Sequence, residues 1–160
     1  MSDPRAAPRR QVVATREQGQ RHGRWLWLAL GAFVLRVAAQ PAAFLTGWRV
    51  LPSFEAWQSG AMPYGWLLVS QLVIIGWMTR TARRVNSGAE RPSRARGRVV
   101  AAAAGLYGAA MVTRLLLGMT LFRGHWWFDA PLPTAFHIVI ASYLGGYAHY
   151  LLRAGDIETP

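Results

Sequence analysis

Residues 99–121 read VVAAAAGLYGAAMVTRLLLGMTL, and this stretch decides the fold because its only charged residue is Arg114. Crossing the hydrocarbon core of a bilayer, roughly 30 Å thick, takes about 20 mostly apolar helical residues. The stretch has neither the polar stripe of a soluble helix nor the alternation of a barrel strand. Three further segments share this character: residues 25–45, 63–79 and 132–152. The sequence therefore predicts an all-α, polytopic integral membrane protein with four transmembrane helices in an up-down bundle.

The composition of the whole chain agrees with a membrane location. Of its 160 residues, 52% are hydrophobic and 12% are aromatic, yet the formal net charge is +11. A small soluble domain cannot bury so much apolar surface, whereas lipid can cover it if the charge lies outside the hydrocarbon. The chain contains no cysteine, which excludes disulfides, thiolate zinc sites and iron–sulfur clusters.

The positions of the arginines predict the orientation of the four spans. All 18 basic residues are arginine; six lie in residues 1–24 and seven in residues 80–98, whereas the other two connections hold only Arg49 and Arg123. The positive-inside rule places the arginine-rich segments in the cytoplasm. Both termini are then cytoplasmic, in a bacterial-type cytoplasmic (inner) membrane. Residues 1–24 are predicted to be a basic, disordered cytoplasmic tail, residues 25–152 the membrane domain, and residues 153–160 a C-terminal cytoplasmic tail.

The same arginines bear on the partners of the protein. Basic residues near a membrane surface attract anionic lipid headgroups by about 1 kcal/mol each, and we expect this contact at both arginine-rich segments. Nucleic-acid binding is not predicted, because neither segment alternates aromatic residues with arginine as a stacking platform would. Small residues on the spans allow close helix packing in lipid. We therefore expect a homo-oligomer or a subunit of a larger membrane complex.

Several polar side chains lie inside the predicted spans, where they are costly and normally face a bundle interior or a wet cavity. At a rise of about 1.5 Å per residue, Arg36 and Gln71 come near the midplane, and Arg114 and His137 lie in the outer half of the membrane. Gln40 is one turn from Arg36 on the same helix face. Polar groups from all four spans thus converge. The predicted ligand-binding residues are Arg36, Gln40, Gln71, Tyr107, Arg114 and His137.

Helical spacing predicts which face of the third span carries its polar groups. Tyr107 and Arg114 share a stripe with Ala103, Ala110 and Gly118, at spacings of three and four residues. Small residues let helices approach closely in lipid. We therefore expect this stripe to pack inside the bundle together with its polar members.

The two arginines within the spans have no obvious counter-ion, because no acidic residue lies in any span. The nearest carboxylates are those of Glu55 and Asp129, in the outer connections. Two cations without partners favour an external anionic or carbonyl-bearing ligand: a lipid phosphate, a carboxylate or a quinone. The alternative is that Arg36 and Arg114 snorkel, or that they hydrogen-bond to backbone carbonyls freed near Pro41.

The outer connections are rich in aromatic and polar residues. Such residues usually form an interfacial belt, and the alternative is an aromatic mouth over the polar site. If His125 and Asp129 share a helical turn, they offer a two-group metal or acid–base site. A pair of residues at this spacing is a weak signal for such a site. The predicted outer-rim residues are Glu55, His125, Trp126, Trp127 and Asp129.

These patterns predict a small four-helix inner-membrane protein that acts as an accessory subunit or binding module for an anionic lipid or a quinone-like amphiphile. Two alternatives stay open: a component of a membrane oxidoreductase that handles quinone or haem, and a subunit of an oligomeric small-solute transporter. No catalytic residue, metal site or cofactor is predicted beyond a bound quinone or lipid. A haem within this chain is disfavoured, because His137 and His149 lie roughly 18 Å apart on one helix and His22 lies in the tail.

Overall fold

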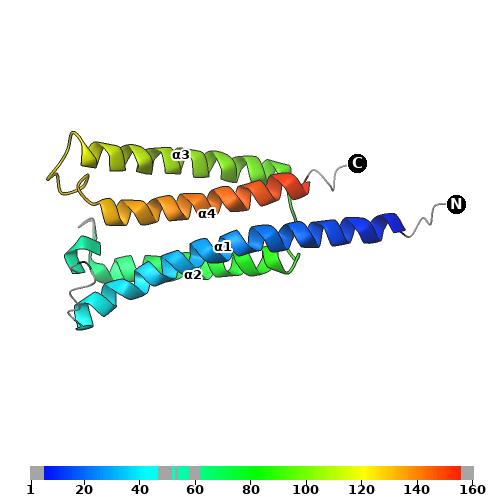
Figure 1. The fold of residues 1–160 in the computed structure, drawn as a ribbon, viewed down its shortest axis with the longest axis horizontal. Helices are drawn as coiled ribbons and strands as arrows, with labels where there is room; N and C mark the ends of the chain where they lie inside the picture. Colours follow the sequence, from blue (N-terminus) through cyan, green and yellow to red (C-terminus); the bar gives the residue numbers. More distant parts are fainter. Residues whose placement is uncertain (1–5, 47–51, 53, 58–61, 156–160) are drawn as a thin grey trace.

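The computed structural model is an all-α bundle, and it describes residues 6–46, 52, 54–57 and 62–155. Consecutive long helices run in opposite directions (Figure 1). The predicted four-helix bundle is confirmed. Its elements are helix α1 (Ala6–Thr46), the short 3-10 helix η1 (Phe54–Trp57), α2 (Tyr64–Asn86), α3 (Arg94–Met119) and α4 (Pro131–Gly155).

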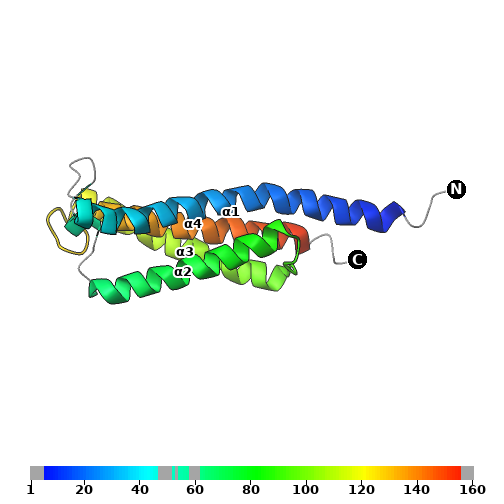
Figure 2. The same cartoon turned by 90° about the horizontal axis from the view of Figure 1, so that it is seen from below.

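Three edges of the bundle are closed and one is not. Helix α3 packs along α4, and α1 packs against both α2 and α4. Over the described residues, no Cα atom of α2 lies within 8 Å of one in α3. Figure 2 shows α2 diverging from the other helices toward one end of the bundle. The edge between α2 and α3 is therefore the unpacked one.

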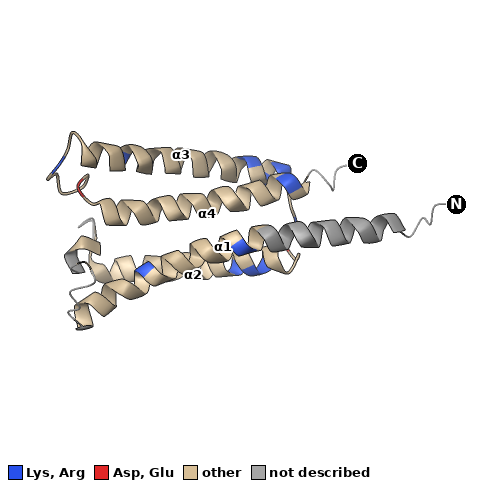
Figure 3. Ribbon diagram, in the orientation of Figure 1, with Lys and Arg blue, Asp and Glu red and all other residues tan. Residues whose placement is uncertain are grey.

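The exposed positive charge gathers at one end of the bundle, which is named the arginine-rich end here (Figure 3). It is formed by the end of α2, the start of α3 and the end of α4, together with the part of α1 beside them. The other end, where η1 and the α3–α4 loop lie, is the opposite end. The exposed arginines of the arginine-rich end are Arg24, Arg80, Arg83, Arg84, Arg91, Arg94, Arg96, Arg98 and Arg153.

Helix α1 begins within the segment that the sequence analysis assigns to an N-terminal tail. The helix begins at Ala6 and continues without a break into the first apolar segment. Residues 6–24 are rich in Ala, Arg and Gln, which have high helix propensity, and Pro8 lies in the first turn, where a missing N–H costs little. Low apolar content argues against a packed core, but it does not prevent a helix from propagating out of an apolar one.

The loop between α2 and α3 is shorter than predicted, because both helices continue past their apolar segments and leave only residues 87–93 between them. Gly88 ends α2 with a φ of 70°, a conformation that glycine adopts without strain. Ser93 caps α3, since its side chain accepts a hydrogen bond from the Arg96 N–H at 3.5 Å. Arginine is a good helix former, and six of the seven arginines of residues 80–98 lie within α2 or α3.

Glu90 anchors this loop to the bundle. Its side chain is buried, although seven arginines lie nearby in the sequence. Its carboxylate lies 2.9 Å from Arg84 of α2 and 3.0 Å from Arg96 of α3. It also accepts a hydrogen bond from the hydroxyl of Tyr147 in α4, at 3.0 Å. One carboxylate thus joins three helices at the arginine-rich end, a role that the sequence analysis did not predict.

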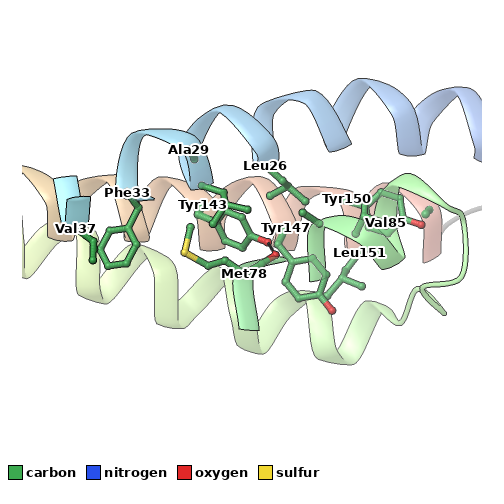
Figure 4. Close-up of a cluster of buried hydrophobic side chains, with 13 residues drawn as sticks. Leu26, Ala29, Phe33, Val37, Met78, Val85, Tyr143, Tyr147, Tyr150 and Leu151 are labelled. Carbon is green, nitrogen blue, oxygen red and sulfur yellow. Dashed lines mark hydrogen bonds between the residues drawn. The ribbon is translucent and has the colours of Figure 1, made fainter. Parts of the chain in front are cut away.

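The apolar core lies in the half of the bundle next to the arginine-rich end (Figure 4). Because α2 has no close backbone contact with α4, large side chains bridge the space between them. The hydroxyl of Tyr143 donates to the carbonyl of Met78 at 2.6 Å, and the Trp77 ring lies 5.9 Å from the Tyr143 ring. Helix α1 completes the core with residues at spacings of three and four: Leu26, Ala29, Leu30, Phe33 and Val37.

Two of the four helices are long and apolar enough to cross a membrane. These are His22–Leu45 within α1, with a mean hydropathy of 1.7, and Arg94–Met119, with a mean hydropathy of 1.6. The core helix of a soluble protein, which is mostly buried, and a signal sequence near the N-terminus meet the same two criteria. Within the described residues, α2 and α4 do not meet them, so this test supports two of the four predicted spans. Only 33% and 11% of the residues in the two apolar stretches are buried.

Candidate functional site

A cavity of about 320 Å³ occupies the half of the bundle toward the opposite end. All four helices, η1 and the α3–α4 loop contribute to its walls. Five of the six predicted ligand-binding residues line it, so the predicted convergence is present as geometry; their binding role stays a prediction. The lining includes Phe33, Arg36, Trp57, Leu67, Ser70, Gln71, Ile74, Tyr107, Met111, Arg114, Trp127, Phe136 and His137.

Arg36 reaches from α1 to the main chain of η1. The residue is 5% exposed, and its Nη2 donates to the carbonyl of Trp57 at 2.7 Å. The guanidinium also lies 5.8 Å from the centre of the Phe136 ring. Trp57 is held in turn, because its Nε1 donates to the Pro52 carbonyl at 3.1 Å and its ring stacks on Phe136. The Nη1 of Arg36 is buried and has no partner among the described residues.

Arg114 makes the corresponding contact from α3. Its Nε and Nη2 donate to the carbonyl of Trp127 at 3.1 and 2.6 Å, and its guanidinium lies 4.3 Å from the centre of the Trp127 ring. The loop can approach this closely because Gly118, one turn further on, has no side chain. A Cβ atom there would lie 2.8 Å from the carbonyl carbon of Phe128, and closer still to its oxygen.

Both buried arginines thus donate hydrogen bonds to backbone carbonyls, which was one alternative to an external ligand in the sequence analysis. The carbonyls, however, belong to Trp57 and Trp127 of the connections at the opposite end, and not to the helix near Pro41. A carbonyl satisfies a donor but carries no net charge. The bonds therefore fix the guanidiniums in place without neutralising them.

No carboxylate compensates these two charges within the described part of the chain. The described lining of the cavity contains no acidic side chain. Asp129, one of the two predicted counter-ions, instead accepts a hydrogen bond from the Gly124 N–H at 2.8 Å, within its own loop. The side chain of Glu55, the other candidate, lies outside the described residues. The cavity is therefore positively charged as described.

Tyr107 and His137 form a second polar contact on the cavity wall, between α3 and α4. The Tyr107 hydroxyl and the His137 Nδ1 are 2.5 Å apart, with the two rings perpendicular. The hydroxyl donates or accepts according to the tautomer of the imidazole. This pair gives the cavity a group that can hydrogen-bond to a carbonyl or to an anion.

The two glutamines of the predicted site behave differently. Gln71 of α2 lines the cavity, is 4% exposed, and its Oε1 has no partner among the described residues. Half a turn of its amide would present the N–H₂ group instead, so Gln71 can serve as donor or acceptor. Gln40 is fully buried, and neither of its amide atoms has a described partner. It is not among the described lining residues, and its ligand-binding role stays a prediction.

The predicted packing stripe of α3 needs a partial correction. Tyr107 is half-buried and Gly118 is buried, but Ala103 and Ala110 are exposed. The buried face is centred one position further along, where Ala104 lies. Spacings of three and four residues identify one face of a helix but do not determine which of its residues contact a neighbouring helix.

The predicted outer-rim residues do not act as one group. Trp127 lines the cavity, whereas the side chain of Trp126 is 66% exposed. His125 and Asp129 do share a turn, since the Asp129 N–H donates to the His125 carbonyl at 2.8 Å. Their side chains bond to different backbone groups: the His125 Nδ1 accepts from the Trp127 N–H at 3.3 Å, and the Asp129 carboxylate bonds to Gly124. The described contacts therefore do not form a joint acid–base or metal site.

Two further contacts were not predicted from the sequence. Phe136, whose ring lies beside both Arg36 and Trp57, carried no polar signal that could have singled it out. His22 was set aside as a tail residue, but its ring centre lies 5.2 Å from that of His149. The two meet because α1 continues as a helix alongside α4. Within the described chain, no group of three or more metal-ligating side chains occurs.

Comparison of this chain with protein-family models, with curated protein sequences and with solved structures finds no match. The cavity itself is therefore the guide to function. It combines guanidinium, imidazole, phenol and amide groups with apolar walls. This set can bind a molecule that has an anionic or carbonyl-bearing head and a hydrocarbon body.

Proposed function

We propose that this chain is a four-span inner-membrane protein with cytoplasmic termini, and that it acts as an accessory subunit or binding module for an anionic amphiphile. The observation that carries the proposal is a cavity with two buried guanidiniums and no carboxylate in its described lining. The membrane location and the ligand class have separate support.

The membrane location is supported by large apolar side chains that point away from the bundle. A surface of this kind is unfavourable in water and favourable in lipid. Within residues 25–45, 63–79, 99–121 and 132–152, the only arginines are Arg36 and Arg114, and both are buried. Residues 25–45 of α1 span about 30 Å by helical rise, which matches the hydrocarbon core. The most exposed examples are Leu28, Leu35, Phe44, Leu45, Trp66, Val99, Leu106 and Leu121.

The orientation is supported by the charge at the two ends. Exposed arginines gather at the arginine-rich end, which by the positive-inside rule faces the cytoplasm. The opposite end, with η1 and the α3–α4 loop, then faces outward. The cavity accordingly lies in the outer half of the membrane.

The ligand class is supported by the charge of the cavity. A buried cation without a counter-ion is costly in a low-dielectric medium, and an anionic head would lower that cost. Phosphate and carboxylate oxygens also accept paired hydrogen bonds from guanidinium. The unpartnered Nη1 of Arg36 is available for this, and Gln71 can add an amide donor. The apolar lining, with Leu67 and Met111, suits a hydrocarbon chain.

A quinone is the second candidate ligand, and the contact between Tyr107 and His137 favours it. Either residue can present a hydrogen-bonding group to a neutral carbonyl within the cavity. A quinone would make the chain a component of a membrane oxidoreductase. It would leave both guanidinium charges uncompensated, however, and for this reason the anionic ligand is preferred.

The test is a thermal unfolding titration of the purified protein in mild detergent, with two added lipids that share the same acyl chains. Anionic phosphatidylglycerol should raise the unfolding temperature, because a ligand that binds the folded state stabilises it. Zwitterionic phosphatidylcholine should have a smaller effect. The Arg36→Gln and Arg114→Gln variants should lose the difference between the two lipids.

The matched control is Arg123→Gln, since Arg123 is exposed and lies in the α3–α4 loop outside the cavity. It should respond to the two lipids as the parent chain does. Equal stabilisation of the parent chain by both lipids would refute the anionic class. A bound quinone identified by mass spectrometry in the parent chain, and lost in Tyr107→Phe, would favour the second candidate.

A further inference from the structure

We infer that the ligand is an anionic phospholipid taken from the surrounding bilayer, and that it enters the cavity sideways between α2 and α3. Its head would lie at Arg36 and Arg114, and its hydrocarbon chain in the unpacked edge. The inference rests on the proposed function and narrows it, because a water-soluble anion would need a different path.

The unpacked edge is the natural opening of the cavity. Both α2 and α3 contribute side chains to its lining, yet their backbones stay more than 8 Å apart throughout the described residues. The other three edges of the bundle are closed by helix packing. A membrane-embedded cavity with one open edge is in contact with lipid along that edge.

Access from the aqueous side at the opposite end is obstructed. Trp57 and Trp127 both line the cavity there, and each is held through its backbone carbonyl by one of the two arginines. Trp57 is only 6% exposed. The loop that carries Trp127 also lies against α3 at Gly118, where no side chain could be added without a clash. The two arginines would therefore bind the lipid head, and they also hold in place the segments that carry Trp57 and Trp127 above it.

The chemistry of the open edge suits a hydrocarbon chain. Its walls include Leu67 and Ile74 from α2 and Met111 from α3, none of which offers a hydrogen bond. The polar groups lie deeper in the cavity, with Gln71 and Arg36 buried to more than nine-tenths. A phosphate could therefore bind inside while its acyl chain stays among the lipids.

The experiment closes the edge with a chemical cross-link. Since the chain has no cysteine, the double variant Ile74→Cys/Met111→Cys can be cross-linked specifically by a short bifunctional thiol reagent. The two positions lie at similar depth, ten residues from the start of α2 and eight residues from the end of α3. Uptake and release of labelled phosphatidylglycerol are then measured in vesicles, before and after cross-linking. Cross-linking should abolish uptake by the empty protein and release by the loaded one.

The matched control is a link across a closed edge. A Cβ at Gly108 would lie 3.5 Å from that of Ala141, which fits a disulfide between Gly108→Cys and Ala141→Cys. This link should leave lipid exchange unchanged. Exchange that continues in the cross-linked α2–α3 variant would overturn the sideways path, as would binding of glycerol phosphate with the affinity of the whole lipid. If the uncross-linked protein binds no phosphatidylglycerol at all, the proposed function itself fails.

Discussion

Replacing Gly118 by alanine measures how closely the α3–α4 loop is held against α3. The new Cβ would lie 2.8 Å from the carbonyl carbon of Phe128, whereas carbon atoms in contact stay about 3.5–4.0 Å apart. The loop backbone must therefore move by roughly 1 Å. The 3.1 Å bond from Arg114 to Trp127 would then exceed hydrogen-bonding distance.

The expected loss of stability combines two effects and one small gain. Overpacking costs about 1–3 kcal/mol, and a hydrogen bond from a charged donor contributes about 1.5–3 kcal/mol. Alanine in place of glycine within a helix returns about 1 kcal/mol. We therefore expect Gly118→Ala to lower the free energy of unfolding by about 3 kcal/mol.

Gly108→Ala is the control for this measurement, because it lies on the same helix but has room. Its Cβ would meet that of Ala141 at 3.5 Å, an ordinary contact. This variant should be neutral, or more stable by up to about 1 kcal/mol. Both are compared in mixed micelles by titration with a denaturing detergent, followed by circular dichroism. Equal unfolding midpoints for the two variants would refute the close contact at Gly118.

Three further experiments test other contacts by the same titration. Tyr143→Phe should lower the free energy of unfolding by about 1 kcal/mol, because the hydroxyl bond to Met78 is lost while its carbonyl keeps its place in the helix; no change would argue against that bond. Glu90→Gln should lower the free energy of unfolding by about 1–3 kcal/mol, because both ion pairs are lost while the half-exposed arginines can be solvated by water. An unfolding midpoint equal to that of the parent chain would contradict the anchoring role of Glu90. A double-mutant cycle of Tyr107→Phe and His137→Leu should give a coupling energy of about 1 kcal/mol, and additive effects would mean that the two side chains do not interact.

The number and type of helices followed from the sequence because hydropathy reports them directly. Residues 99–121 were predicted as one helix, and all but the last two of them lie within α3. The ends at the arginine-rich side were predicted too short, since a hydropathy boundary marks where lipid would end and not where hydrogen bonding ends. Glu90 shows a different limit: a single acid among arginines looks like an ordinary loop residue until the fold brings three helices to it.

The positions of the polar residues along the helices could be predicted from the sequence, but their hydrogen-bond partners could not. Helical rise alone was enough to bring Arg36, Gln71, Arg114 and His137 toward one level, and the cavity contains all four. The carbonyls that hold the arginines could not be predicted, because every residue has a carbonyl and only the path of the loops decides which one is near. Gln40 shares a helix face with Arg36 but is absent from the described lining, since a shared helix face does not determine which neighbours pack around a side chain.

The unequal packing of the two ends explains why the cavity lies where it does. Near the arginine-rich end, Tyr143 and Tyr147 fill the space between α4 and α2, and Glu90 secures the loop that follows α2. Toward the opposite end, the described backbone of α2 meets only α1, and the space beside it is open. Atoms that line a void lack dispersion contacts with a partner. A bound amphiphile would therefore make contacts with α2 in place of those that α3 does not make. Binding in the cavity and the stability of the opposite end are then thermodynamically linked, because a ligand held only by the assembled bundle stabilises that assembly.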